Sequence, residues 1–63
     1  MTIDKFKHYL GENLFSFISS LTLSQLIKMK AALLEDINTI SHTGDVLFKR
    51  TIELQYINYL INE

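Results

Sequence analysis

The chain has 63 residues, a net charge of −1 and an apolar share of 48%. This length predicts one domain, residues 1–63, and the nearly balanced charge excludes a general electrostatic attraction to nucleic acids or membranes. Cysteine is absent, which excludes disulfides and thiolate zinc sites. A core this small rarely contributes more than about 3–5 kcal/mol of net stability, so close helix packing or association with another chain has to supply the rest.

Apolar residues recur at steps of three and four from Ile3 to Leu21, which is the spacing of one helix face. The pattern predicts a single helix over residues 3–20 that continues through Gly11, although glycine is about 1 kcal/mol less favourable there than alanine. A break at Gly11 is the alternative. Phe15 lies off the apolar face, either as a singly exposed aromatic or as an anchor for a partner helix.

A capping box marks the start of the second predicted helix. Thr22 suits the N-cap position because its hydroxyl can accept from the first helical turn, and Gln25 follows three residues later. We therefore expect a helix over residues 23–40 with one broad apolar face. Lys30 projects from the middle of that face, where its stem either covers the edge of the core or pairs with an acid across an oligomer interface.

The third predicted helix covers residues 45–62, after a turn that contains Gly44. Apolar residues occupy most of its circumference, beside one narrow polar stripe, and two neighbouring helices can cover only part of such a surface. Either this helix fills the groove between the other two, or one side of it meets another chain. The amphipathic aromatics near its end favour an interface. The residues that we expect there are Tyr56, Tyr59 and Leu60.

Three helices with short connections predict an all-α fold, a small up-down-up three-helix bundle. In such a bundle the first and third helices begin at the same end. The basic residues near those two starts would then form a local positive patch, which could contact phosphates without reading sequence. These residues are Lys5, Lys7, Lys49 and Arg50.

No group of residues points to catalysis. His42 lies in the second turn beside Ser41, Thr43 and Asp45, but sequence neighbours in a turn rarely reach the geometry of a catalytic triad. A solvated histidine near a helix end is the simpler interpretation. We expect no enzyme activity, no cofactor, no metal and no small-molecule ligand.

The predicted function is that of a small accessory or regulatory protein. It would bind another protein, or form a homodimer, through the apolar surface of the third helix, with Phe15 and Lys30 as further contacts. The alternative is a nucleic-acid-binding accessory factor that uses the four basic residues. The longest uncharged stretch, residues 13–27, is too short and too polar for a membrane span. We therefore expect a cytoplasmic protein without membrane contact.

Overall fold

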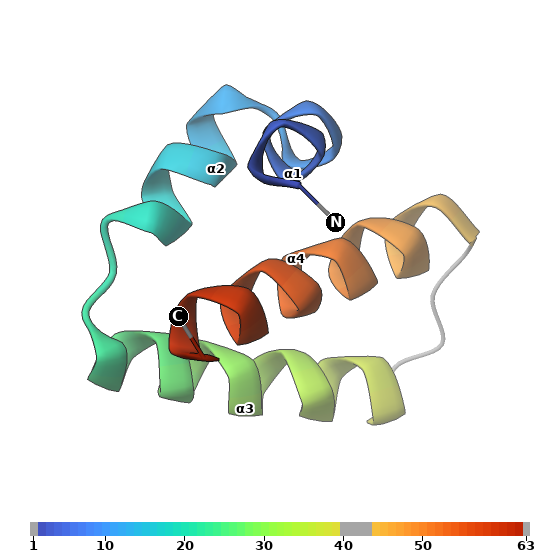
Figure 1. The fold of residues 1–63 in the computed structure, drawn as a ribbon. Helices are drawn as coiled ribbons and strands as arrows, with labels where there is room; N and C mark the ends of the chain where they lie inside the picture. Colours follow the sequence, from blue (N-terminus) through green and yellow to red (C-terminus); the bar gives the residue numbers. More distant parts are fainter. Residues whose placement is uncertain (1, 40–43, 63) are drawn as a thin grey trace.

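The computed structural model describes residues 2–39 and 44–62. Over these ranges the chain forms four α-helices and is all-α, as predicted (Figure 1). None of these helices is both long and apolar enough to cross a bilayer. The four are α1 (Ile3–Leu10), α2 (Glu12–Ser19), α3 (Leu23–Thr39) and α4 (Gly44–Asn62).

The prediction of one helix over residues 3–20 is wrong, because the helix breaks at Gly11. This residue has φ +86° and ψ 154°, a conformation that is open to glycine and strained for other residues. Its N–H donates to the Lys7 carbonyl (3.0 Å) and so closes α1, and its carbonyl accepts from the Phe15 N–H (2.9 Å) at the start of α2. The alternative of a break at this glycine is therefore confirmed.

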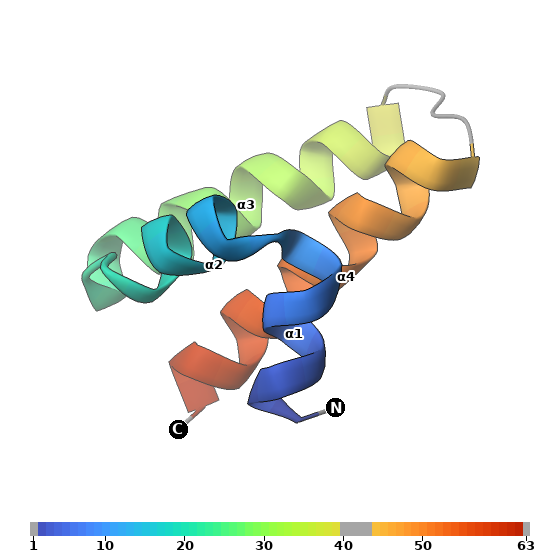
Figure 2. The same cartoon turned by 90° about the horizontal axis from the view of Figure 1, so that it is seen from above.

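The helices do not form the predicted up-down-up bundle of three. α3 and α4 run antiparallel side by side, whereas α1 is seen end-on in Figure 1 while α4 runs across the page. Figure 2, turned by 90°, confirms that α1 crosses α4 and that α2 bends away from it. α4 therefore lies in the middle, packed against α3 on one side and α1 on the other. The break at Gly11 allows this arrangement, because α1 and α2 can pack against α4 in different directions.

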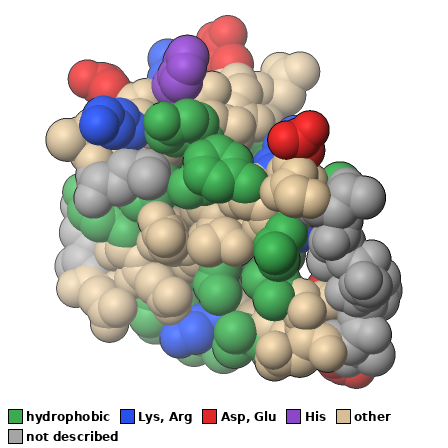
Figure 3. All heavy atoms as spheres, turned by 90° about the vertical axis from the view of Figure 1, so that its right-hand side faces the viewer, with side chains coloured by type: hydrophobic (Ala, Val, Ile, Leu, Met, Phe, Trp, Pro, Cys, Tyr) green, Lys and Arg blue, Asp and Glu red, His purple; other side chains and the backbone are tan. Residues whose placement is uncertain are grey.

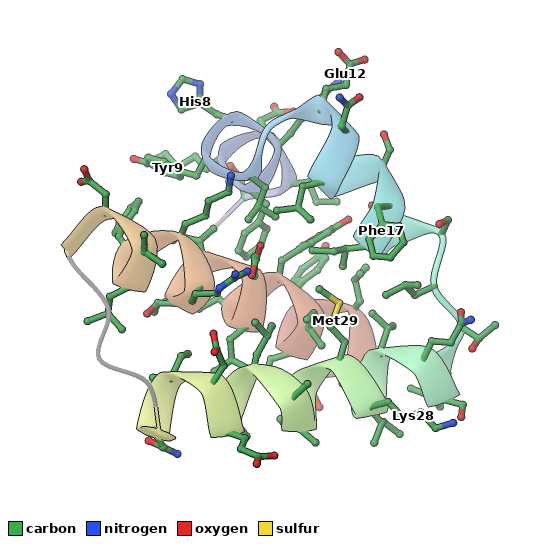
Figure 4. The ribbon with its side chains drawn as sticks, turned by 180° about the vertical axis from the view of Figure 1, so that it is seen from behind. His8, Tyr9, Glu12, Phe17, Lys28 and Met29 are labelled. Atoms are coloured by element: carbon green, nitrogen blue, oxygen red, sulfur yellow. The ribbon has the colours of Figure 1, made fainter. Side chains whose placement is uncertain are left out.

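Every described helix contributes to the core around α4. Figure 4 shows the inner and outer sides of α3 at two neighbouring positions, since Met29 points toward the interior and Lys28 points away. The buried hydrophobic residues are Phe6, Leu10, Ile18, Leu26, Leu33, Ile52, Tyr56 and Ile57.

The capping box at the start of α3 is confirmed. The Gln25 N–H donates to Thr22 Oγ1 (3.3 Å), and the Thr22 N–H donates to Gln25 Oε1 (2.9 Å). The predicted helix over residues 23–40 matches Leu23–Thr39, and the one over residues 45–62 matches Gly44–Asn62. Residues 40–43, which include the histidine of the weak triad, lie outside the described residues.

Replacing Gly11 by alanine should lower the free energy of unfolding by about 1–3 kcal/mol, because alanine is strained at this φ and ψ. Space is not the reason, since an added Cβ would meet nothing within 4 Å. Gly44→Ala is the matched control: its Cβ would also meet nothing, and in a helix this change leaves stability unchanged or raises it by up to about 1 kcal/mol. Urea unfolding followed by circular dichroism measures both, and equal effects would contradict the backbone explanation.

Candidate interaction surface

Tyr56 is the centre of an aromatic cluster inside the subunit. Its ring centroid lies 4.9 Å from Phe6 of α1 and 5.0 Å from Phe15 of α2, with Phe15 stacked at an interplanar angle of 18°. The Tyr56 hydroxyl lies 2.5 Å from Ser19 Oγ. Because Ser19 already donates to the Phe15 carbonyl (2.7 Å), the tyrosine is the donor of this bond. The side chain is only 3% exposed, so Tyr56 lies in the core and not on the expected interface.

The other residues expected at the interface are half-buried. Phe15, Tyr59 and Leu60 all pack against the buried core, and the ring of Tyr59 lies 5.9 Å from that of Phe6. Phe15 is therefore neither a singly exposed aromatic nor a free anchor, because it covers Tyr56. α1, α2 and α3 together cover most of the second half of α4, and the excess apolar surface of the chain lies elsewhere.

That excess lies on the first turns of α4 and on the outer sides of the other helices. Nine large hydrophobic side chains of the described residues are more than two-fifths exposed. They are Ile3, Tyr9, Phe17, Leu23, Ile27, Leu34, Val46, Leu47 and Phe48.

Three aromatic side chains join α1 to the first turns of α4. The ring of Tyr9 contacts that of Phe48 edge to face at 5.4 Å, and the His8 ring packs on the other side of Tyr9 at 5.4 Å. Figure 4 shows Tyr9 between α1 and the first turns of α4, and His8 pointing away from α1. In Figure 3 hydrophobic side chains gather below the histidine. We call His8, Tyr9 and Phe48 the aromatic patch.

A second apolar surface lies along α3. Leu23, Ile27 and Leu34 are 58%, 53% and 41% exposed, and at about 100° per residue they share one side of the helix, roughly a quarter turn from buried Leu26 and Leu33. Lys30 lies on the same side between Ile27 and Leu34, and it is half-buried. We call Leu23, Ile27, Lys30 and Leu34 the α3 stripe.

An ion network connects α3 to α4. Arg50 Nη1 donates to Glu53 Oε2 at 3.1 Å, and Arg50 Nε lies 3.4 Å from Asp36 Oδ2 without hydrogen-bond alignment. Glu53 is 2% exposed. The sequence reasoning missed Glu53, although an acid three residues after an arginine, in an otherwise apolar stretch, is the pattern of a pair on one helix face.

The four basic residues are not gathered at one end of the molecule. The starts of α1 and α4 lie apart in Figures 1 and 2, and Arg50 is held in the ion network. Lys5 and Lys7 are both exposed, but their positions on α1 are about 200° apart and so do not share a face. Lys49 is exposed near the start of α4. Positive and negative side chains are interspersed on the face in Figure 3.

An open pocket of about 370 Å³ lies against the first half of α4. Its volume is within the range of small-ligand pockets. The charged residues that line it are two acids and two bases, so the pocket has no net charge that would favour an anion or a cation. Within residues 2–39 and 44–62, no three potential metal ligands come together. The pocket is lined by Leu14, Asp45, Val46, Lys49, Arg50 and Glu53.

Comparison with protein-family models, with curated proteins and with solved structures finds no match to this chain.

Replacing Arg50 by alanine should lower the free energy of unfolding by about 3 kcal/mol, because it leaves the buried Glu53 carboxylate without its partner. The double variant Arg50→Met with Glu53→Leu removes both charges and should stay within about 1 kcal/mol of the parent. Lys49→Ala, at an exposed neighbouring position, is the control and should change stability by less than about 0.5 kcal/mol. Denaturant titration separates these cases, and a double variant as unstable as Arg50→Ala would contradict the explanation.

Tyr56→Phe should lower the free energy of unfolding by about 1 kcal/mol, because it removes the hydrogen bond to Ser19 while keeping the ring contacts. Tyr59→Phe removes the hydroxyl of a half-buried ring and should change stability by less than about 0.5 kcal/mol. Thermal unfolding of the two variants tests this difference. Equal shifts in Tm would show that the bond between Tyr56 and Ser19 does not contribute.

Proposed function

We propose that the protein is a small non-enzymatic accessory protein that acts by binding another protein, and that the partner docks on the aromatic patch. The observation that carries this proposal is the exposed contact between Tyr9 and Phe48, which are 45% and 51% exposed. Aromatic residues are enriched among those that dominate binding energy at protein interfaces. The apolar surface of the third predicted helix remains the basis of the function, at its first turns instead of near its end.

The first turns of α4 support this proposal independently of the aromatic contact. Val46, Leu47 and Phe48 are consecutive and all more than two-fifths exposed. At about 100° per residue they point in three directions around the helix, so no single packing within the subunit could bury them all. Complete burial of a fully exposed side chain of this size contributes roughly 1.5–3 kcal/mol, and about half of that is still to be gained at each of these positions, because each is already about half covered. A partner that encloses this end of α4 would gain that free energy, which the isolated subunit does not use.

The partner's surface follows from the shape of this region. His8 points away from the helices in Figure 4, whereas Tyr9 lies between α1 and the first turns of α4, where its ring contacts Phe48. A partner that encloses these two half-exposed rings would present a concave, apolar surface. Such a groove between helices of a larger protein could take Phe48 and Tyr9 as anchors, with the His8 ring at its polar rim.

A photo-crosslinking amino acid at position 48, introduced in cells that produce the protein naturally, tests the proposal. We expect one discrete adduct from position 48 and none from position 55, because Gln55 lies two turns further along the same side of α4. Tyr9→Ser should reduce the adduct at least about tenfold, while leaving the helical circular dichroism unchanged, since Tyr9 is exposed.

Two outcomes would overturn the proposal. One is the same set of adducts from positions 48 and 55, which would show non-specific contact. The other is a discrete adduct at position 48 that Tyr9→Ser does not reduce.

A further inference from the structure

We infer that the α3 stripe is the interface of a homodimer, in which two copies of α3 pack antiparallel about a two-fold axis. This interface is separate from the aromatic patch, so it does not depend on the function proposed for that patch. Three properties of the α3 stripe support this homodimer: the spacing of its residues, the positive charge of Lys30 and the area that two copies could bury.

The spacing of the residues in the α3 stripe is the same from either end of the helix. Its members follow one another at steps of four, three and four residues, from Leu23 to Leu34. A two-fold axis that passes between positions 28 and 29 therefore places Leu23 opposite Leu34 of the second copy, and Ile27 opposite Lys30 of the second copy. A two-fold interface has to be self-complementary in this way, because the same patch occurs on both sides.

Lys30 fits this arrangement through the end of the second copy's α4. In each subunit the last turn of α4 lies beside the first half of α3, because the two helices run antiparallel (Figure 1). That last turn contains no basic residue, and its free carbonyls carry a partial negative charge. The stem of Lys30 can cover Ile27 of the second copy while the ammonium group reaches those carbonyls.

The area of the stripe makes the dimer a weak one. A standard interface covers about 800 Å² per partner, nearly a fifth of the 4428 Å² of this subunit. The stripe is about 17 Å long and one helix wide, and so smaller than that standard. We expect a dissociation constant on the order of 100 μM.

Sedimentation equilibrium from about 10 μM to about 1 mM protein tests the dimer. The unchanged chain should shift from monomer to dimer over this range, and Ile27→Asp should weaken the association at least about tenfold. Phe17→Asp is the matched control, because Phe17 is as exposed as Ile27 but lies on α2, and it should leave the dimer unchanged. Helical circular dichroism confirms that each variant is folded.

Disulfide formation tests the register, since the chain has no cysteine of its own. An equimolar mixture of the Leu23→Cys and Leu34→Cys variants should form a disulfide between different variants under mild oxidation. Neither variant alone should do so, because two copies of position 23 would be about 17 Å apart along the helix, too far for a disulfide.

Three results would overturn the homodimer. They are a chain that stays monomeric at about 1 mM, an equal loss of association in Phe17→Asp and Ile27→Asp, and disulfides that form as readily within each single variant as in the mixture.

Discussion

The contacts of Tyr56 hold α1 and α2 against α4. The ring receives Phe6 from α1 and Phe15 from α2, and its hydroxyl bonds to Ser19 near the end of α2. Both short helices are thereby fixed on the second half of α4, while α3 packs along its other side. A chain this small can bury only a limited area. Because α1 and α2 pack on the second half of α4, little of them is left to cover its first half.

The exposed surfaces follow from this uneven coverage. On the first turns of α4, Val46, Leu47 and Phe48 stay about half exposed, although the ring of Tyr9 from α1 contacts Phe48 at a nearly perpendicular angle. α3 buries one side against α4 and leaves the α3 stripe at a quarter turn from it. The two surfaces lie on different helices and differ in chemistry, since one is aromatic and the other is aliphatic with a single lysine. This difference would suit the two partners proposed above, a second protein and a second copy of the chain.

The ion network bears on the alternative function. Arg50 pairs with Glu53 on its own helix and with Asp36 across the interface with α3. An arginine with two carboxylates beside it would have to break these pairs to bind a phosphate, and the buried Glu53 would then lose its partner. Of the other three basic residues, Lys5 and Lys7 point in different directions on α1, and Lys49 lies on α4. Arg50 is therefore held in the ion network and is not free to join the basic patch that the alternative function needs.

The local features of this protein could be predicted from its amino-acid sequence. The capping box at Thr22 and Gln25 and the helical period depend on residues close in the chain, and the predicted bounds of α3 and α4 agree with the described ones. The break at Gly11 could not be predicted in this way, because a glycine accepts both the helical conformation and the positive φ found here, and tertiary packing selects between them. The buried face of α4 could not be predicted from the sequence either. Apolar residues lie on nearly all sides of this helix, so their pattern does not indicate which side faces the core. Coverage by α1, α2 and α3 buried Tyr56 and left Phe48 exposed, since burial depends on which helices reach each turn.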